Sequence, residues 1–240
     1  MKSMKKLVGL AMLAGAVVGA SSTAQAEVEL SGNVAMTSDY VFRGISQTDA
    51  SPAIQGGFDL GAGMFYAGVW GSSVDFKGYS DESATMELDL YAGITPSTGP
   101  VDWDLGVIGY FYPSADDDLN FDFYELYAAP SFAITDAFGV GAALSYSPEF
   151  FGDTGEGLYV EINGSYAVTD ALSLSAAFGN QDVDDIGDYD TWNIGASYAV
   201  AGFDLGLTYV DTEGADDPST WGLSETLTDG RIVFSIGRSL

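Results

Sequence analysis

The sequence has 240 residues with 35 acidic and 7 basic side chains, and it contains neither histidine nor cysteine. This composition excludes disulfide bonds, catalysis by cysteine or histidine, and the usual ligands of zinc. A formal net charge of −28 argues against nucleic acid as a partner, because binding nucleic acid requires basic residues that neutralise phosphates.

The N-terminus has the organisation of a secretory signal peptide. Three lysines within the first six residues precede an uncharged apolar stretch, 7–20, and small residues follow up to Ala26. This apolar stretch of 14 residues is shorter than the roughly 20 that a membrane-spanning helix needs. We therefore expect cleavage of residues 1–26, which leaves 27–240 as one exported domain with four basic and 35 acidic residues.

Beyond this segment, apolar residues follow the period of two that is typical of a β-strand. In residues 158–168, Leu, Val and Ile at even positions alternate with Tyr, Glu, Asn and Ser at odd positions. The alternation returns in 86–94, 101–107, 172–178, 192–198, 203–209 and 232–236. Strands with two different faces explain this pattern, and no stretch has a convincing helical period.

Connections between the predicted strands alternate between short and long. The short ones lie at 61–63, 95–100, 135–137, 169–171 and 201–202, and the long ones near 46–51, 75–83, 113–120, 148–155, 181–188 and 211–228. Five short and six long connections join about 12 strands and leave both termini on the side of the short turns. Short periplasmic turns opposite long extracellular loops are typical of outer-membrane barrels.

A sheet that spans a membrane must close on itself, because an open edge in hydrocarbon would leave backbone groups without hydrogen bonds. We therefore predict an all-β fold, a closed antiparallel up-and-down transmembrane β-barrel with longer acidic extracellular loops. Aromatic residues gather near the predicted strand ends, as they do in interfacial girdles, although they could also be core residues. The predicted outer girdle comprises Tyr40, Phe42, Phe111, Tyr112, Phe121, Phe123, Trp192 and Tyr209, and the inner one Phe65, Trp103, Phe132, Phe138, Tyr166, Tyr198 and Phe203.

Four short segments carry a resemblance to a known family. They are residues 38–48 (SDYVFRGISQT), 52–59 (PAIQGGFD), 65–72 (FYAGVWGS) and 123–127 (FYELY). Together they resemble the TorF-like porin family, and the resemblance extends from about residue 27 to the end. It implies a porin-type barrel in the cell outer membrane, and it implies neither a substrate nor catalytic residues.

The polar phase of the strands should face the barrel interior if the apolar phase faces lipid. Under this assignment the predicted pore-lining residues are Arg43, Glu87, Asp89, Asp104, Glu125 and Glu161. Arg43 is in phase with Thr37, Asp39 and Val41, so we expect its side chain to turn inward near the outer mouth. It could pair with the acids there or form part of a constriction, and structural pairing is the favoured role.

No metal or cofactor site is expected. Residues 182–187 begin like a calcium-binding EF-hand loop, but Ile186 occupies the fifth position and Asn193 the twelfth, where a glutamate is needed. The acidic loop residues are better explained as solvated charge. Divalent cations that bridge these loops to lipopolysaccharide remain an open alternative, with outer-membrane lipid as the other expected partner.

The sequence favours a porin that passes small hydrophilic solutes and prefers cations, because carboxylates are predicted to line its lumen. About twelve strands should give a narrow pore, since eight are filled by side chains and 16–18 leave an open channel. Two alternatives remain, a non-conducting barrel whose acidic loops bind a ligand or partner and a purely structural membrane protein. None of the three is an enzyme, and the sequence gives no oligomeric state.

Overall fold

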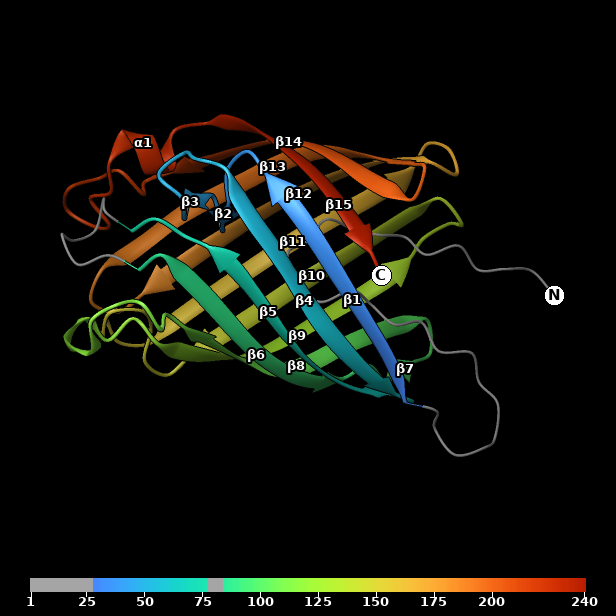
Figure 1. Ribbon diagram of the computed structural model, residues 1–240, viewed down its shortest axis with the longest axis horizontal. Coiled ribbons are helices and arrows are strands. Elements are labelled where there is room, and N and C mark those ends of the chain that lie inside the picture. The colour runs from blue at the N-terminus through green and yellow to red at the C-terminus, as the bar shows by residue number, and fades with distance from the viewer. Residues whose placement is uncertain (1–27, 77–83) are drawn as a thin grey trace.

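The computed structural model describes residues 28–76 and 84–240, which form a closed antiparallel β-barrel (Figure 1). The predicted signal peptide lies outside the described residues. The barrel strands are β1 (Glu29–Thr37), β4 (Ala53–Ala62), β5 (Phe65–Ser73), β6 (Met86–Ile94), β8 (Val101–Phe111), β9 (Phe123–Ala133), β10 (Phe138–Ser147), β11 (Gly157–Ala167), β12 (Leu172–Val183), β13 (Gly187–Val200), β14 (Phe203–Glu213) and β15 (Arg231–Ser239). The predicted twelve-stranded barrel is thereby confirmed.

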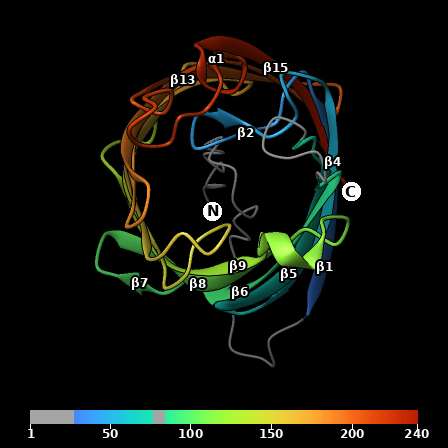
Figure 2. The ribbon, with the colours of Figure 1, turned by 90° about the vertical axis from the view of Figure 1, so that its left-hand side faces the viewer.

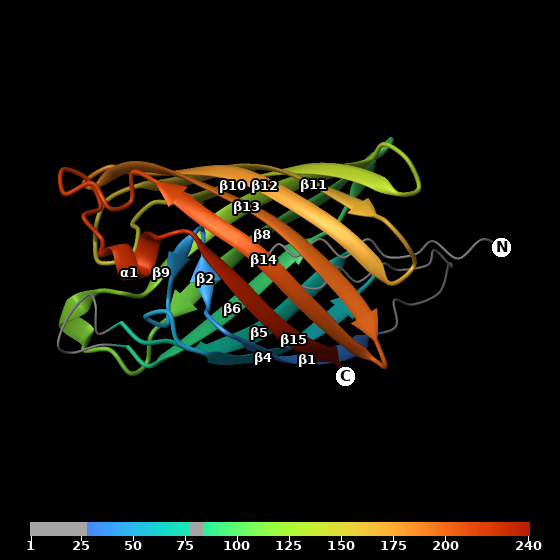
Figure 3. The same cartoon turned by 90° about the horizontal axis from the view of Figure 1, so that it is seen from above.

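Pairing between the first and last strands closes the barrel. β1 runs antiparallel to β15, from Asn33 opposite Ser239 to Thr37 opposite Ser235. Each other barrel strand pairs with its neighbours in the chain, so the topology is a simple up-and-down meander. The strands are inclined to the barrel axis, and the longer connections gather at the end opposite the C-terminus (Figures 1 and 3).

Alternation along each strand separates an outer apolar face from an inner polar one. In β11 the side chain of Ile162 is 63% exposed, whereas Tyr159 on the opposite face is 7% exposed. The outward set includes Leu90, Val160, Ile162, Leu174, Ile194, Leu207 and Phe234. An outer surface of this composition matches hydrocarbon, and the polar side chains are left to fill the interior.

Four short elements complete the described chain. They are β2 (Val41–Phe42), β3 (Ile45–Ser46), β7 (Ser97–Thr98) and the helix α1 (Glu225–Thr228), with a 3-10 turn at Asp117–Leu119. β7 pairs with β8 at the short-turn end, and β2 and β3 pair only with each other. No helix among the described residues is long and apolar enough to cross a membrane.

The structure corrects three local predictions. The first strand ends at Thr37 instead of continuing past Arg43, because residues 38–52 leave the barrel wall and fold into a loop that contains β2 and β3. The first short turn lies at residues 63–64, between β4 and β5. The connection from β12 to β13 spans only 184–186, so it is as short as the turns at the other end.

The two predicted aromatic girdles differ in outcome. At the short-turn end, the rings of Phe65, Phe132, Phe138, Tyr166, Tyr198 and Phe203 are exposed on the outer surface, as predicted. At the long-loop end, Trp192 is 40% exposed and packs against Tyr209 with ring centroids 5.3 Å apart. However, Tyr40, Tyr112, Phe121 and Phe123 are buried inside the barrel, so the predicted outer girdle is largely wrong.

Candidate functional site

A hairpin that folds into the barrel is the main feature of the interior. Figure 2 shows β2 within the ring of barrel strands, and Figure 1 shows β2 and β3 near the long-loop end. The turn between them is formed by Arg43 (φ 46°) and Gly44 (φ 87°). A Cβ atom on Gly44 would clash with Cγ2 of Thr212 and lie 2.5 Å from Oγ1 of Thr191, so only glycine fits this approach to the wall.

Asp39 fixes the base of the hairpin. Its Oδ1 accepts hydrogen bonds from Oγ of Ser46 at 2.7 Å and from Oγ1 of Thr48 at 2.8 Å. Its Oδ2 accepts a bond from Nη1 of Arg231, on β15, also at 2.8 Å. Because Asp39 is buried, this satisfied network ties both arms of the loop to each other and to the wall.

Arg43 fastens the tip of the hairpin to the opposite wall. Its Nη1 and Nη2 donate to the two carboxylate oxygens of Glu125, on β9, at 2.8 and 2.7 Å, and Nη1 also donates to Oε1 of Gln181, on β12, at 2.7 Å. The guanidinium lies 4.6 Å from the ring centroid of Phe42 and 4.3 Å from that of Tyr159. Bidentate pairing combined with ring contact is the geometry that arginine favours.

This ion pair is almost completely shielded from solvent. The side chain of Arg43 is 7% exposed and that of Glu125 is 2% exposed. Burial lowers the pKa of Arg43, but the negative charge of Glu125 outweighs this effect and places the pKa above its ordinary value. Arg43 therefore remains charged. Its side chain lies inside the barrel and pairs with Glu125, and a role in lining a pore stays a prediction.

Glu87 and Asp89 lie on β6 on the same inward face. Glu87 is 2% exposed, and its Oε1 accepts a hydrogen bond from the hydroxyl of Tyr40 at 2.7 Å. Asp89 is 5% exposed, and its Oδ1 has no hydrogen-bond partner within the described part of the chain. Glu87, Asp89 and Glu125 are thus three buried carboxyl groups in this part of the interior, and the guanidinium of Arg43 pairs with Glu125.

The other inward acids take hydrogen bonds from neighbouring polar side chains. Glu161 accepts bonds from the hydroxyl of Tyr159 at 2.8 Å and from Nδ2 of Asn163 at 3.0 Å. Asp59, on β4, accepts a bond from the hydroxyl of Tyr91 at 2.5 Å. These contacts keep the acids of the interior hydrogen-bonded even where no basic residue reaches them.

Asp104, on β8, belongs to a similar group nearer the short-turn end. It accepts a hydrogen bond from the hydroxyl of Tyr66, which also contacts the hydroxyl of Tyr127. The alternation of the sequence predicted these acids inside, but it did not predict their tyrosine partners. The sequence could have indicated these partners, because four tyrosines fall in the inward phase of their strands: Tyr66, Tyr91, Tyr127 and Tyr159.

The long-loop half of the interior is packed with aromatic rings. Phe121 stacks on Phe151 with centroids 4.2 Å apart, and Phe76 packs edge to face against both of these rings. On the other side of the hairpin, Ile45 packs with Tyr189, Ala215 and Leu227, and α1 lies against β3. The hairpin is therefore held from two sides by apolar contacts.

The six predicted site residues all turn inward, but they form more than one group. Arg43 and Glu125 are in direct contact, and Glu87 and Asp89 share a strand nearby, whereas Asp104 and Glu161 belong to separate tyrosine-bonded groups. Within the described residues, no set of three or more acidic side chains is arranged to hold a metal ion.

Comparison with known sequences supplies the family. The sequence model of Gcw_chp, described as a bacterial protein of unknown function, matches residues 21–240. The chain belongs to the Gcw_chp family. None of the curated proteins matches it. The narrower resemblance to TorF-like porins is not confirmed and stays a prediction.

Solved structures with the same fold as this Gcw_chp protein are outer-membrane porins. The KdgM porin matches with a TM-score of 0.57 and 9% identity, covering 87% of this chain and 97% of that chain. KdgM porin in complex with disordered oligogalacturonate matches with a TM-score of 0.56 and 9% identity, covering 88% and 96%. The COG4313 outer membrane channel from Pseudomonas putida F1 matches with a TM-score of 0.50 and 10% identity, covering 91% and 96%. At such identities the likeness shows the fold alone.

Proposed function

We propose that this protein is an outer-membrane channel that admits small hydrophilic solutes, prefers cations and is narrowed by the hairpin of β2 and β3. The observation that carries the proposal is the inward position of the buried carboxyl groups, of which Arg43 pairs with Glu125 and not with Glu87 or Asp89. A barrel wall of low dielectric strengthens their field, which attracts cations and repels anions.

The proposed solutes differ in charge from the ligand of the KdgM porin. The KdgM porin forms a complex with oligogalacturonate, which is an acidic oligosaccharide. In this chain the acids Glu87 and Asp89 face the interior, and they would repel such a ligand. The shared fold therefore supports a channel, whereas the acidic interior supports cationic solutes in place of an acidic oligosaccharide.

The proposed localisation follows from the same features. The apolar outer surface supports insertion in the outer membrane, with the long acidic loops outside the cell and the short turns in the periplasm. Residues 1–26 would direct export. Lipopolysaccharide is the proposed neighbour of the loops, with divalent cations as bridges between like charges.

Planar-bilayer recording of the refolded full chain tests this function. In a potassium chloride gradient, we expect a reversal potential of the sign that indicates cation selectivity, and its size should fall as salt rises, because screening shortens to about 3 Å at 1 M. The triple variant Glu87→Gln, Asp89→Asn and Glu161→Gln should reduce selectivity. Anion selectivity of the unmodified protein would contradict the proposal.

A matched control removes the same charge from the rim of the barrel. Asp136→Asn, Asp170→Asn and Asp204→Asn all lie at exposed positions near the short turns. If this control lowers selectivity as much as the interior variant does, total charge rather than position sets the preference. The proposed role of Glu87, Asp89 and Glu161 would then be wrong.

One observation favours the second candidate, a non-conducting barrel that binds a ligand at its loops. The level of the hairpin is filled on both sides, with Phe76 and Leu227 each no more than 2% exposed. A folded protein with no conductance at any voltage would support this candidate over the channel.

A further inference from the structure

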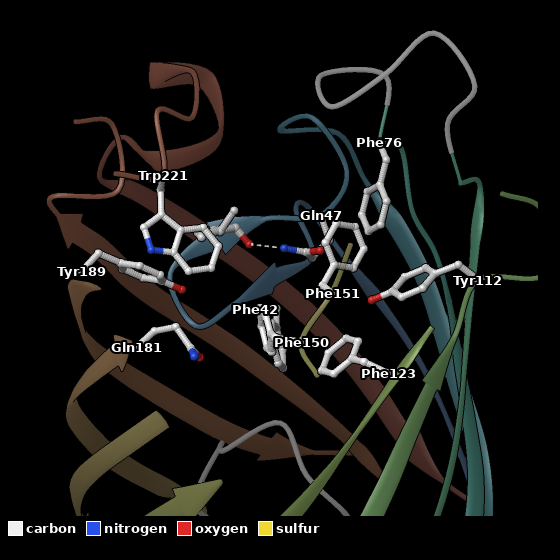
Figure 4. A pocket seen from close by; sticks show the side chains of 11 residues that line it. Phe42, Gln47, Phe76, Tyr112, Phe123, Phe150, Phe151, Gln181, Tyr189 and Trp221 are labelled. Carbon is white, nitrogen blue, oxygen red and sulfur yellow. Dashed lines mark hydrogen bonds between the residues drawn. The ribbon is translucent and has the colours of Figure 1, made fainter. Parts of the chain in front are cut away.

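A pocket lies between the hairpin and the long loops, and its walls are mostly aromatic. The rings of Phe42, Phe76, Phe123, Phe150, Phe151 and Trp221 surround it (Figure 4). The enclosed space measures about 60 Å³ on a scale on which one water molecule needs roughly 10–15 Å³. Phe42, Phe151 and Trp221 are partly exposed. The pocket therefore has room for a compact ligand of a few heavy atoms and a mouth through which it can enter.

The polar side chains of the wall direct their donors into the protein. Four side chains donate to backbone carbonyl groups: Gln47 to Ile45, Gln181 to Leu158 and Asp182, Tyr189 to Arg43, and Trp221 to Gly187. The hydroxyl of Tyr112 donates to the side chain of Glu87. These five donor groups are occupied. The wall consequently offers a ligand aromatic rings and few donors, which suits neither an anion nor a sugar rich in acceptors.

Among the described residues, two carboxyl groups without a basic partner lie close to this wall. Glu87 lies directly behind the wall, bonded to the hydroxyl of Tyr112, and Asp89 follows two residues later on the same face. The positive charge of Arg43 is already paired with both oxygens of Glu125. An aromatic wall backed by a buried carboxylate is a setting in which ring quadrupoles and charge attract the same ligand, a cation.

We propose that this pocket binds small alkylammonium ions. The size of the enclosed space limits the ligand to a compact head group, the rings supply cation–π contacts, and the carboxylate behind Tyr112 supplies the opposing charge. The inference rests on the proposed cation channel for its biological role and deepens it by naming a class of solute. Binding at this site does not require the ion to pass through the barrel, so the two proposals can fail separately.

Titration calorimetry of the refolded full chain in detergent tests the site with three probes of similar shape. They are tetramethylammonium, which is a cation, tert-butanol, which is neutral, and trimethylacetate, which is an anion. We expect tetramethylammonium to bind about tenfold more tightly than tert-butanol, as a partly desolvated cation–π site would give. Trimethylacetate should not bind. Equal affinity of the first two probes, or no binding of tetramethylammonium, would overturn the proposal.

Two pairs of variants locate the binding. Glu87→Gln keeps an acceptor for Tyr112 and Tyr40 but removes the charge, so it should bring the affinity for tetramethylammonium close to that for tert-butanol. Asp118→Asn makes the same charge change at an exposed loop position and should have no effect. Tetramethylammonium should also change tryptophan fluorescence, and Trp221→Phe should abolish this signal while Trp192→Phe, on the outer surface, keeps it.

Conductance separates the outcomes of the two proposals. Binding of tetramethylammonium by a barrel that does not conduct would leave the pocket intact and reject the channel. Conduction by a barrel that does not bind tetramethylammonium more tightly than tert-butanol would keep the channel and reject the pocket. A loss of binding in Asp118→Asn equal to that in Glu87→Gln would show that general surface charge, not the pocket, attracts the cation.

Discussion

Removing the side chain of Arg43 should cost the barrel a large part of its stability. In Arg43→Ala, Glu125, whose side chain is 2% exposed in the unmodified protein, would lose its counterion, and the remaining donor would be the hydroxyl of Tyr110 at 3.3 Å. Removing one partner of a buried ion pair typically costs about 3–5 kcal/mol, because the other charge remains uncompensated. We expect a loss of this size in the free energy of unfolding.

Urea unfolding from detergent micelles, followed by tryptophan fluorescence, measures this loss. Arg238→Ala is the matched control, since Arg238 is exposed on the outer surface with its guanidinium 5.3 Å from the ring centroid of Phe203. Its effect should stay within about 1 kcal/mol. The double variant Arg43→Ala with Glu125→Gln should recover most of the loss, because no buried charge is left alone.

A small effect would refute the reasoning. If Arg43→Ala lowers stability no more than Arg238→Ala does, water must reach Glu125 and the pair must behave as a surface ion pair. The hairpin would then not be held by the tip, and the packing around Ile45 and Asp39 would have to fix it alone. Failure of the double variant to recover stability would instead place the loss in the ring contacts of the guanidinium.

Three further predictions concern the hairpin, the outer surface and the topology. Gly44→Ala should destabilise by about 1 kcal/mol or more in the same unfolding assay, whereas Gly202→Ala, with φ 79° and no atom within 4 Å of the added Cβ, should cost less. Lysine at Ile162 should destabilise the folded barrel in lipid vesicles by about 2–4 kcal/mol if it lies near the midplane, and lysine at the exposed Asp170 should be nearly neutral. On intact cells, an impermeant thiol reagent should label cysteine at Asp184 but not at Asp170, and the reverse pattern would invert the topology.

The barrel could be predicted from the sequence because its signals are local. A period of two within 158–168 fixes which face of β11 is apolar, and turn residues at 169–171 and 201–202 mark where strands reverse. Once the strands and their order are known, closure in a membrane follows from the need to pair every backbone group. The predicted strand ends were less accurate, since Gly61 and Ala62, assigned to the first short turn, belong to β4.

The hairpin could not be predicted because its first residues imitate a strand. Thr37, Asp39, Val41 and Arg43 keep the alternation, so local pattern extends the first strand through them. What redirects the chain is a set of contacts to distant residues, including Arg43 to Gln181, which lies 138 positions away. No periodicity encodes such pairs. The positive φ at Gly44 becomes meaningful only when the neighbouring wall is known.

The same contacts determine where the negative charge of the interior can act on a solute. Glu125 is neutralised by Arg43, and Asp39 is paired with Arg231, so these two acids contribute little net field. Glu87 receives a hydrogen bond from the neutral Tyr40, and Asp89 keeps one oxygen without a partner among the described residues. Among the described residues neither of these two carboxyl groups has a basic partner, so where either is ionised its charge is not offset at the level of the hairpin. Any cation preference of the barrel should therefore be set by these two residues on β6 rather than by the total charge of the chain.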